Sequence, residues 1–140
     1  MKKYKIGIVG ATGAVGQEII NLLEKREFPV SEARLLASSR SAGREIQACG
    51  NLEVVSETKP DSFKGLDIAI FSAGSQNTEM FADSASKNNC VVIDNSSAFR
   101  MDENVPLVIP EINGDELESH RGIISNPNCS TAVALMSLFP

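Results

Sequence analysis

The chain has 140 residues, of which 42% are hydrophobic and 22% charged, which is the size and composition of one globular domain. Its 13 Lys and Arg residues and 18 Asp and Glu residues give a net charge of −5. This balance argues against a nucleic-acid partner, because phosphate backbones are bound by clustered basic residues. No apolar run approaches the roughly 20 residues that a membrane-spanning helix needs, so no membrane partner is expected.

Three cysteines, Cys49, Cys90 and Cys129, are far apart in the sequence and odd in number. They form neither a disulfide framework nor the spacing of a metal site, so we expect no bound metal and a reducing, cytoplasmic location. The short apolar run at residues 6–9 leads directly into a glycine turn, which is unlike the long apolar segment of a signal peptide.

Short apolar runs alternate with amphipathic stretches along the first half of the chain, a pattern typical of βαβ units. We predict a buried strand over residues 4–9, a helix over residues 14–25 and a second strand over residues 33–37. Residues 46–58 are compatible with one or two short strands or with a hairpin.

The second half of the chain continues the alternation. Its predicted elements are strands over residues 67–71, 90–93 and 122–125 and helices over residues 78–87 and 128–138. Pro106 predicts that the extended run over residues 105–109 is peripheral. The predicted fold class is α/β, a Rossmann-type doubly wound, mostly parallel sheet with helices on both faces.

The first predicted strand ends in a turn with glycines at positions 10, 13 and 16. Gly10 allows a tight turn out of the strand, Gly13 allows a pyrophosphate to approach the backbone, and Gly16 allows the helix to pack closely on the sheet. The start of the helix would present free N–H groups to the phosphates. An ordinary strand-to-helix turn is the alternative, but a motif placed between a strand and a helix favours a dinucleotide site.

The end of the second predicted strand favours NADP (NADPH) over NAD as the cofactor. NAD sites usually place a carboxylate there to bind the ribose 2′-hydroxyl, whereas residues 37–43 contain none. Ser38, Arg40 and Ser41 could instead bind a 2′-phosphate, although they also suit a polar surface loop. After the next strong strand, the small residues Ser72 and Gly74 permit close approach of the cofactor.

The segment around Cys129 predicts a reactive thiol. Asn128 is a good N-cap residue, so Cys129 would lie in the first turn of the last helix, where the helix dipole stabilises a thiolate. A buried structural cysteine is the alternative, and Cys49 and Cys90 fit it better than Cys129 does. We therefore interpret Cys129 as the candidate nucleophile.

Arg100 and Asn95 lie in a loop that follows the strand over residues 90–93. Arg100 could bind a phosphate or a carboxylate with help from Asn95, and a solvated surface arginine is an equal alternative. A nicotinamide cofactor and a thiolate together suggest attack on an acyl group, formation of a thioester and hydride transfer. His120 is interpreted as a surface residue, which leaves the thiol without an evident general base.

Six motifs resemble those of the aspartate-semialdehyde dehydrogenase family, and they occur in the family's order along nearly the whole chain. They are GATGAVG at residues 10–16, LASSRSAG at 36–43, FSAG at 71–74, DNSSAFR at 94–100, VPLVIPEIN at 105–113 and NPNCST at 126–131. The resemblance implies the reversible NADPH-dependent reductive dephosphorylation of L-aspartyl 4-phosphate to L-aspartate 4-semialdehyde. This step leads toward lysine, threonine, methionine and diaminopimelate.

The resemblance also implies roles for individual residues. Cys129 matches the family's nucleophile, Arg100 its phosphate-binding arginine, and Asn95 a further contact to the substrate phosphate. The family's NADP contacts fall on Thr12, Gly13, Ala14, Val15, Arg40 and Ser41.

Members of this family are much longer than this chain and form homodimers or homotetramers. Their second half supplies a histidine base and most of the subunit interface. Residues 1–140 are therefore interpreted as an NADP-binding domain that ends in the catalytic-cysteine helix, and we expect it alone to bind cofactor weakly and to catalyse little. The apolar residues 132–139 agree with this interpretation, because such a helix needs a covering partner.

Two other functions remain open from the sequence. N-acetyl-glutamyl-phosphate reductase shares the architecture and the thiol chemistry, but its cysteine segment typically contains NPGCY, so Asn128 and Ser130 favour the aspartyl enzyme. A non-catalytic NADP-binding module is the second alternative. The presence of Cys129 and Arg100 argues against it, since cofactor binding requires neither residue.

Overall fold

A computed structural model describes residues 2–139, so Met1 and Pro140, the two ends of the predicted domain, lie outside the described residues. Six strands form one parallel sheet in the order β5-β2-β1-β6-β7-β8. These strands are β1 Tyr4–Val9, β2 Val30–Ala37, β5 Ser56–Glu57, β6 Ile68–Phe71, β7 Val91–Asp94 and β8 Ile123–Ser125. The other elements are a hairpin of β3 Glu45–Ala48 and β4 Asn51–Val54, the helices α1 Ala14–Lys25, α2 Ser75–Lys87, α3 Pro110–Asn113 and α4 Cys129–Leu138, and 3₁₀ helices over Pro60–Phe63 and Gly114–Ser119.

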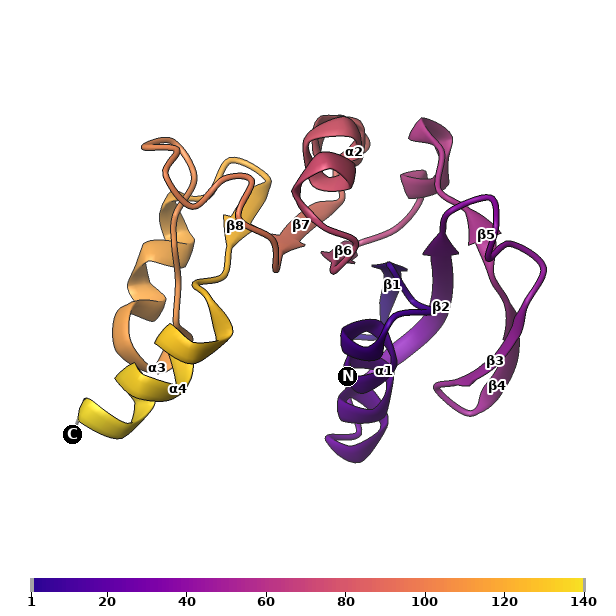
Figure 1. The fold of residues 1–140 in the computed structure, drawn as a ribbon, viewed down its shortest axis with the longest axis horizontal. Helices are drawn as coiled ribbons and strands as arrows, with labels where there is room; N and C mark the ends of the chain where they lie inside the picture. Colours follow the sequence, from indigo (N-terminus) through magenta and orange to yellow (C-terminus); the bar gives the residue numbers. More distant parts are fainter. Residues whose placement is uncertain (1, 140) are drawn as a thin grey trace.

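Helices lie on both faces of the sheet, with α1 below it and α2 above it in Figure 1. On the α1 face, Ile6, Ile8 and Leu35 of β1 and β2 pack with Ile20 of the helix in one buried cluster. Parallel strands that are covered on both faces have nearly continuous apolar sequences, which is why the strand at residues 4–9 is recognisable. The predicted doubly wound α/β fold is confirmed.

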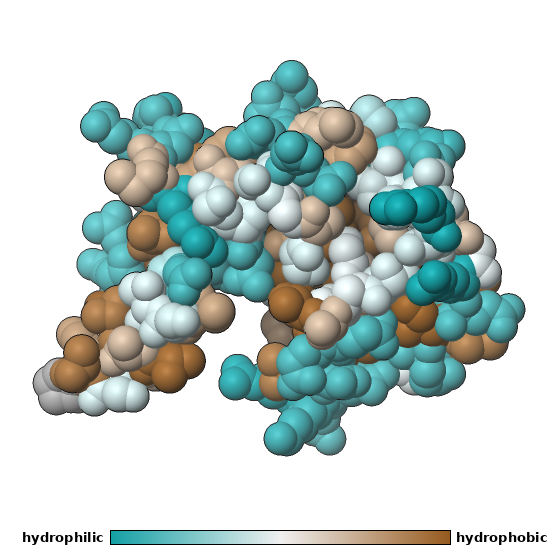
Figure 2. Space-filling view, viewed as in Figure 1, coloured by the Kyte–Doolittle hydropathy of each residue, from teal (hydrophilic) through white to brown (hydrophobic). Residues whose placement is uncertain are grey.

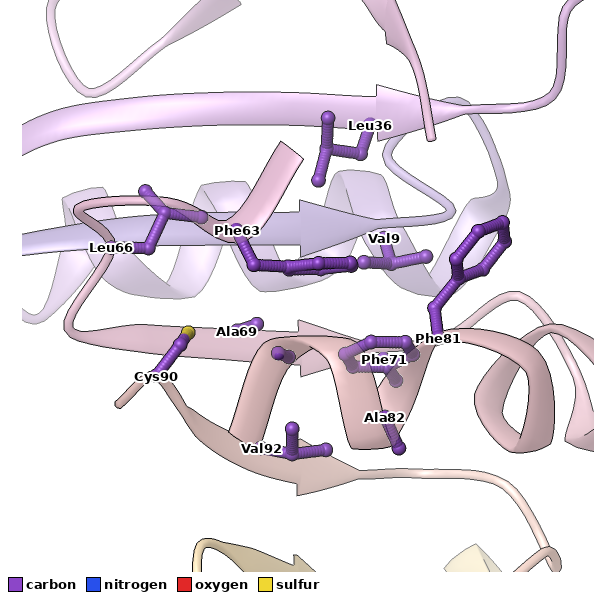
Figure 3. Packing of buried hydrophobic residues seen from close by; sticks show 11 residues of the cluster. Val9, Leu36, Phe63, Leu66, Ala69, Phe71, Phe81, Ala82, Cys90 and Val92 are labelled. Carbon is purple, nitrogen blue, oxygen red and sulfur yellow. The ribbon is translucent and has the colours of Figure 1, made fainter. Parts of the chain in front are cut away.

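The α2 face holds the aromatic part of the core. The rings of Phe63 and Phe71 stack with their centroids 5.6 Å apart, and Phe81 of α2 lies 6.4 Å from Phe63. Figure 3 shows these rings together with Val9 and Leu36, so that β1, β2, β6 and α2 all contribute to one cluster. The cluster fixes the position of α2 over the middle of the sheet.

Residues 46–58, for which the sequence left strands and a hairpin open, contain both. The hairpin β3–β4 lies outside the main sheet, and Val55 after it is buried in the α1-face cluster. The next two residues form β5, in which Ser56 and Glu57 pair with Leu36 and Ala37 of β2. The chain thus returns to the sheet beside the carboxyl end of β2.

Three predicted segments differ from the structure. Strand β2 begins at Val30 rather than residue 33, because Ser31 and Glu32 interrupt the apolar run on which the prediction was based. Helix α2 begins at Ser75. The predicted start at residue 78 was late, because the first turn of the helix is polar and shows no apolar periodicity. The prediction that residues 105–109 are peripheral is wrong for Val108 and Ile109, which are buried. Pro106 does not prevent the burial of these two residues, because the backbone pairing with β8 at this position needs a carbonyl and no N–H. The Pro106 carbonyl accepts a hydrogen bond from Ser125 N at 2.9 Å.

The last helix, α4, has no buried residue. Val133 is 69% exposed and Leu138 is 79% exposed, and apolar side chains of this region are visible at the lower left of Figure 2. Within residues 2–139, α4 therefore lacks the cover that its composition requires. No helix of this part of the chain combines the length and the apolar character needed to cross a bilayer.

Gly16→Ala is expected to destabilise the fold by about 1–3 kcal/mol. A Cβ at this position would meet the carbonyl oxygen of Gly10 and would lie 2.8 Å from the Cα of Ala11, and neither backbone atom can move without disturbing the glycine turn. The measurement is the free energy of unfolding in urea, followed by circular dichroism.

The matched control is Gly114→Ala, since a Cβ at residue 114 would meet nothing within 4 Å and its φ is −61°. The control is expected to stay within about 0.5 kcal/mol of the unchanged protein. Equal losses in the two variants would contradict a close approach of α1 to the turn.

Candidate functional site

The carboxyl ends of the six parallel strands lie at one edge of the sheet, and the candidate residues follow them. The chain runs from β1 to β2 on one side and later returns to β6 on the other side of β1. In open α/β sheets, ligands bind at such a switch point, outside the carboxyl ends of the strands.

The glycine turn after β1 has the geometry of a phosphate-binding turn. Gly10 has a φ of +90°, and a Cβ there would lie 2.9 Å from the backbone of Ser72, so only glycine fits. Gly13 is the N-cap of α1, with no side-chain capping bond and no acidic residue in the first turn. The first turn of α1 can therefore donate backbone hydrogen bonds to an anion.

A cleft of about 470 Å³ lies between this turn, the end of β2 and the start of α2. Five predicted cofactor residues line it, namely Gly10, Thr12, Gly13, Ser38 and Ser72. Its apolar wall includes Val9, Ala37, Ala73, Met80 and Phe81, and Figure 3 shows Phe81 beside the ends of β1 and β6. A cleft of this size, with one apolar wall and convergent hydroxyls, fits a nucleotide.

The other predicted cofactor residues lie around the cleft rather than in its wall. The Thr12 hydroxyl donates to the Ser41 hydroxyl at 3.4 Å and so joins the glycine turn to the loop after β2. Arg40 is exposed on that loop, and within residues 2–139 it has no carboxylate partner. Ala14 and Val15 are exposed in the first turn of α1. Gly74 lines a neighbouring hollow formed by residues 73–77.

Five polar or flexible residues that line the cleft were not predicted from the sequence, and one of them, Ser39, adjoins the predicted Ser38. Glu57 and Thr58 come from β5 and its end, and Asn77 and Met80 come from α2. Strand β5 is only two residues long, so no periodicity could reveal it. Asn77 belongs to the helical turn that the sequence did not predict.

Cys129 is the first residue of α4, as predicted from the N-cap Asn128, and its thiol is exposed. The Asn128 Oδ1 accepts a hydrogen bond from Ser130 N at 2.9 Å and lies 3.9 Å from the Cys129 Sγ. The other two cysteines have raised thiol pKa values. Burial, with Asp67 nearby, raises the pKa of Cys90 to about 12, and burial also raises the pKa of Cys49.

Arg100 and Asn95 lie close to the Cys129 segment. Arg100 Nε donates to the carbonyl of Asn126 at 2.8 Å, and its Nη2 donates to the carbonyl of Asn95 at 3.3 Å. The Asn126 side chain in turn donates to Asn95 Oδ1 at 3.3 Å. Arg100 has no acidic partner within the described residues, so its charge is available to an anionic ligand.

The buried carboxylate of Asp94 holds this loop to α2. It accepts hydrogen bonds from the Thr78 hydroxyl at 3.1 Å, from Ser96 N at 2.8 Å and from the Ser96 hydroxyl at 3.0 Å. Asn126 N donates to the carbonyl of Asp94 at 2.8 Å. One residue thereby links the helix beside the cleft to both segments that surround Cys129.

His120 is half-buried, and its Nδ1 accepts a hydrogen bond from Gly122 N at 3.0 Å. It precedes β8, whereas Cys129 follows that strand, so the two residues lie toward opposite ends of it. Cys129 lines its own hollow of about 300 Å³ with Asn95 and Asn126, and this hollow shares no lining residue with the nucleotide cleft. The thiol and the cleft occupy one edge of the sheet but separate cavities.

The doubly wound parallel sheet, with its glycine turn and a cleft at the switch point, defines a dinucleotide-binding domain. The family model described as semialdehyde dehydrogenase, NAD binding domain, matches residues 5–120. The chain belongs to this family, and its resemblance to the aspartate-semialdehyde dehydrogenases is confirmed by curated relatives and solved structures.

The aspartate-semialdehyde dehydrogenase of Bacillus subtilis is 50% identical over 135 residues, which are 96% of this chain and 39% of the relative. The structure of aspartate semialdehyde dehydrogenase II complexed with ASA from Vibrio cholerae matches with a TM-score of 0.91 and 41% identity, over 98% of this chain and 46% of that one. The enzyme of Candida albicans with NADP matches with a TM-score of 0.81 and 30% identity, over 96% and 45% of the two chains. This chain spans about two fifths of the length of the curated relatives.

Iodoacetamide at pH 8 is expected to modify Cys129 first. The Cys129 thiol is exposed at a helix start, whereas Cys90 is 1% exposed. With its pKa raised from 9.0 to about 12, Cys90 has roughly a thousandfold less thiolate at this pH than an ordinary cysteine. Peptide mass spectrometry after timed quenching measures the three rates.

The pH dependence supplies the control for this labelling. Cys90 is expected to stay unmodified until the pH approaches its raised pKa or the fold opens in urea. Labelling of Cys90 as fast as Cys129 in the folded protein would contradict the described packing.

Proposed function

We propose that this chain is the NADP-binding and thiol-bearing part of an aspartate-semialdehyde dehydrogenase. The complete enzyme would catalyse the reversible NADPH-dependent reductive dephosphorylation of L-aspartyl 4-phosphate to L-aspartate 4-semialdehyde, in the cytoplasm and as a homodimer or homotetramer. The observation on which this rests most is the position of Cys129. It is exposed at the capped start of α4, shortly after Asn126, whose carbonyl accepts a hydrogen bond from Arg100, and it lies at the same sheet edge as the nucleotide cleft. The named relatives support the aspartyl enzyme over an N-acetylglutamyl one.

The cleft would hold the nucleotide through the elements already described. The first turn of α1 would bind the pyrophosphate, and Gly10 and Gly13 would let it approach the backbone. Ser38 and Ser41, with the exposed guanidinium of Arg40, would bind the 2′-phosphate of NADP. When bound, NADPH supplies the hydride for reduction of the acyl group.

Cys129 would act as the nucleophile. Its thiolate attacks the carbonyl carbon of the acyl phosphate, the bond from that carbon to the phosphate oxygen breaks, and phosphate leaves with the electron pair. Arg100 and Asn95 would bind the phosphate before and during this departure. After reduction of the resulting thioester, the C–S bond breaks as the aldehyde carbonyl forms, and the thiolate is regenerated.

His120 is not placed to act as the general base for these steps, since it lies toward the other end of β8. Among the described residues, Glu111 is the one carboxylate that lines the hollow of Cys129. Acylation by a thiolate needs no base, whereas deprotonation of the thiol and of the thiohemiacetal hydroxyl in the full, reversible cycle does. The first half-reaction is therefore the step that this chain can be tested for on its own.

The chain is expected to become acylated once per molecule when mixed with L-aspartyl 4-phosphate in the absence of NADPH. Intact-protein mass spectrometry measures the adduct, and a phosphate assay measures the leaving group. Cys129→Ser is expected to abolish both signals, whereas Cys90→Ser, which changes a buried thiol, leaves them in place. Equal acylation of Cys129→Ser would refute the proposed nucleophile.

Arg100→Gln is expected to slow this acylation by about 10- to 100-fold, because hydrogen bonds to charged groups contribute about 1.5–3 kcal/mol. Most of the effect should appear as a higher concentration of acyl phosphate at half-maximal rate. The control is Arg121→Gln, an exposed arginine before β8. If both variants acylate at the unchanged rate, Arg100 does not bind the phosphate.

A further inference from the structure

The nucleotide cleft contains a carboxylate that the sequence did not reveal. Among the described residues that line the cleft, Glu57 is the only charged one. Arg40, the residue predicted to bind a 2′-phosphate, does not line the cleft. The one charged residue that a nucleotide would meet in this lining is therefore acidic.

Backbone pairing fixes where this carboxylate lies. Glu57 pairs in register with Ala37, the last residue of β2. Thr58 N and the Thr58 hydroxyl both donate to the carbonyl of Ala37, at 2.8 and 3.1 Å. Glu57 is thus held next to the end of β2, and Ser38 and Ser39 line the same cleft beside it.

Dinucleotide-binding folds that use NAD place an acidic residue at the end of the second strand, where it binds the ribose 2′-hydroxyl. Here β2 itself ends without one, but its neighbour β5 brings a carboxylate next to that position at the sheet edge. We infer that Glu57 accepts a hydrogen bond from a hydroxyl of the adenosine ribose and so gives this domain affinity for NAD as well as NADP. This inference rests on the proposed nucleotide site and adds a determinant of its selectivity.

Lys59 sets how strongly Glu57 opposes a 2′-phosphate. Its Nζ lies 3.0 Å from Glu57 Oε2, and both side chains are partly exposed. A carboxylate that favours a hydroxyl repels a phosphate at the same place. The ion pair reduces this repulsion, so Glu57 and Lys59 shift the selectivity in opposite directions.

The test is titration of the chain with NADH and with NADPH, followed by the fluorescence of the nicotinamide. Glu57→Gln is expected to raise the Kd for NADH by about five- to tenfold, because an amide accepts a weaker hydrogen bond than a carboxylate. The Kd for NADPH is expected to stay unchanged or to fall. Lys59→Gln is expected to shift the selectivity in the opposite direction, by raising the Kd for NADPH more than the Kd for NADH.

Glu45→Gln is the matched control, since it removes the same charge from an exposed position on β3 outside the cleft. Urea unfolding of each variant checks that the fold is unchanged. If Glu57→Gln changes the ratio of the two Kd values by less than twofold, the inference is wrong and the nucleotide site stands. If the unchanged chain binds neither NADH nor NADPH, the proposed cofactor site fails as well.

Discussion

The parallel alignment of the six strands is the constraint on which the rest of this structure depends. It brings every strand end to one edge, so that residues far apart in the sequence meet there. Ser72 N and the Ser72 hydroxyl both donate to the carbonyl of Val9, at 2.8 and 3.0 Å, which joins the loop after β6 to the glycine turn after β1. The lack of a side chain at Gly10 permits this contact, because a Cβ would strike the Ser72 backbone. The cleft is a consequence of that close approach.

A buried hydrogen-bond network extends the same edge toward the thiol. A buried carboxylate is costly unless its oxygens are satisfied, and Asp94 meets this condition with donors from Thr78 and Ser96. Thr78 belongs to the helix beside the nucleotide cleft, and Ser96 belongs to the loop that contains Asn95 and Arg100. The two cavities share no lining residue, and this network is one of the connections that the described residues provide between them.

Much of the fold was predictable because its signals are local. The strand at residues 4–9 is a continuous apolar run, the start of α4 is marked by Asn128, and Gly10 occupies a position that needs a positive φ. Helix α2 was placed one turn late because its first turn is polar, and the two 3₁₀ helices were missed because elements of four to six residues show no period. The burial of Val108 depends on pairing with β8, which no pattern within residues 105–109 encodes.

The sequence by itself determined the α/β fold class, the glycine turn and the position of Cys129 at a helix start. Each of these depends on residues close together in the chain and on backbone preferences that act locally. Only the tertiary structure decided which side chains share a cavity. It placed Glu57 in the nucleotide cleft and left Arg40 outside it, because a two-residue strand pairs with the end of β2 across the 19 residues between Ala37 and Glu57. Such pairing is selected by the burial of Val55 and the neighbouring core, which is a property of the folded chain as a whole.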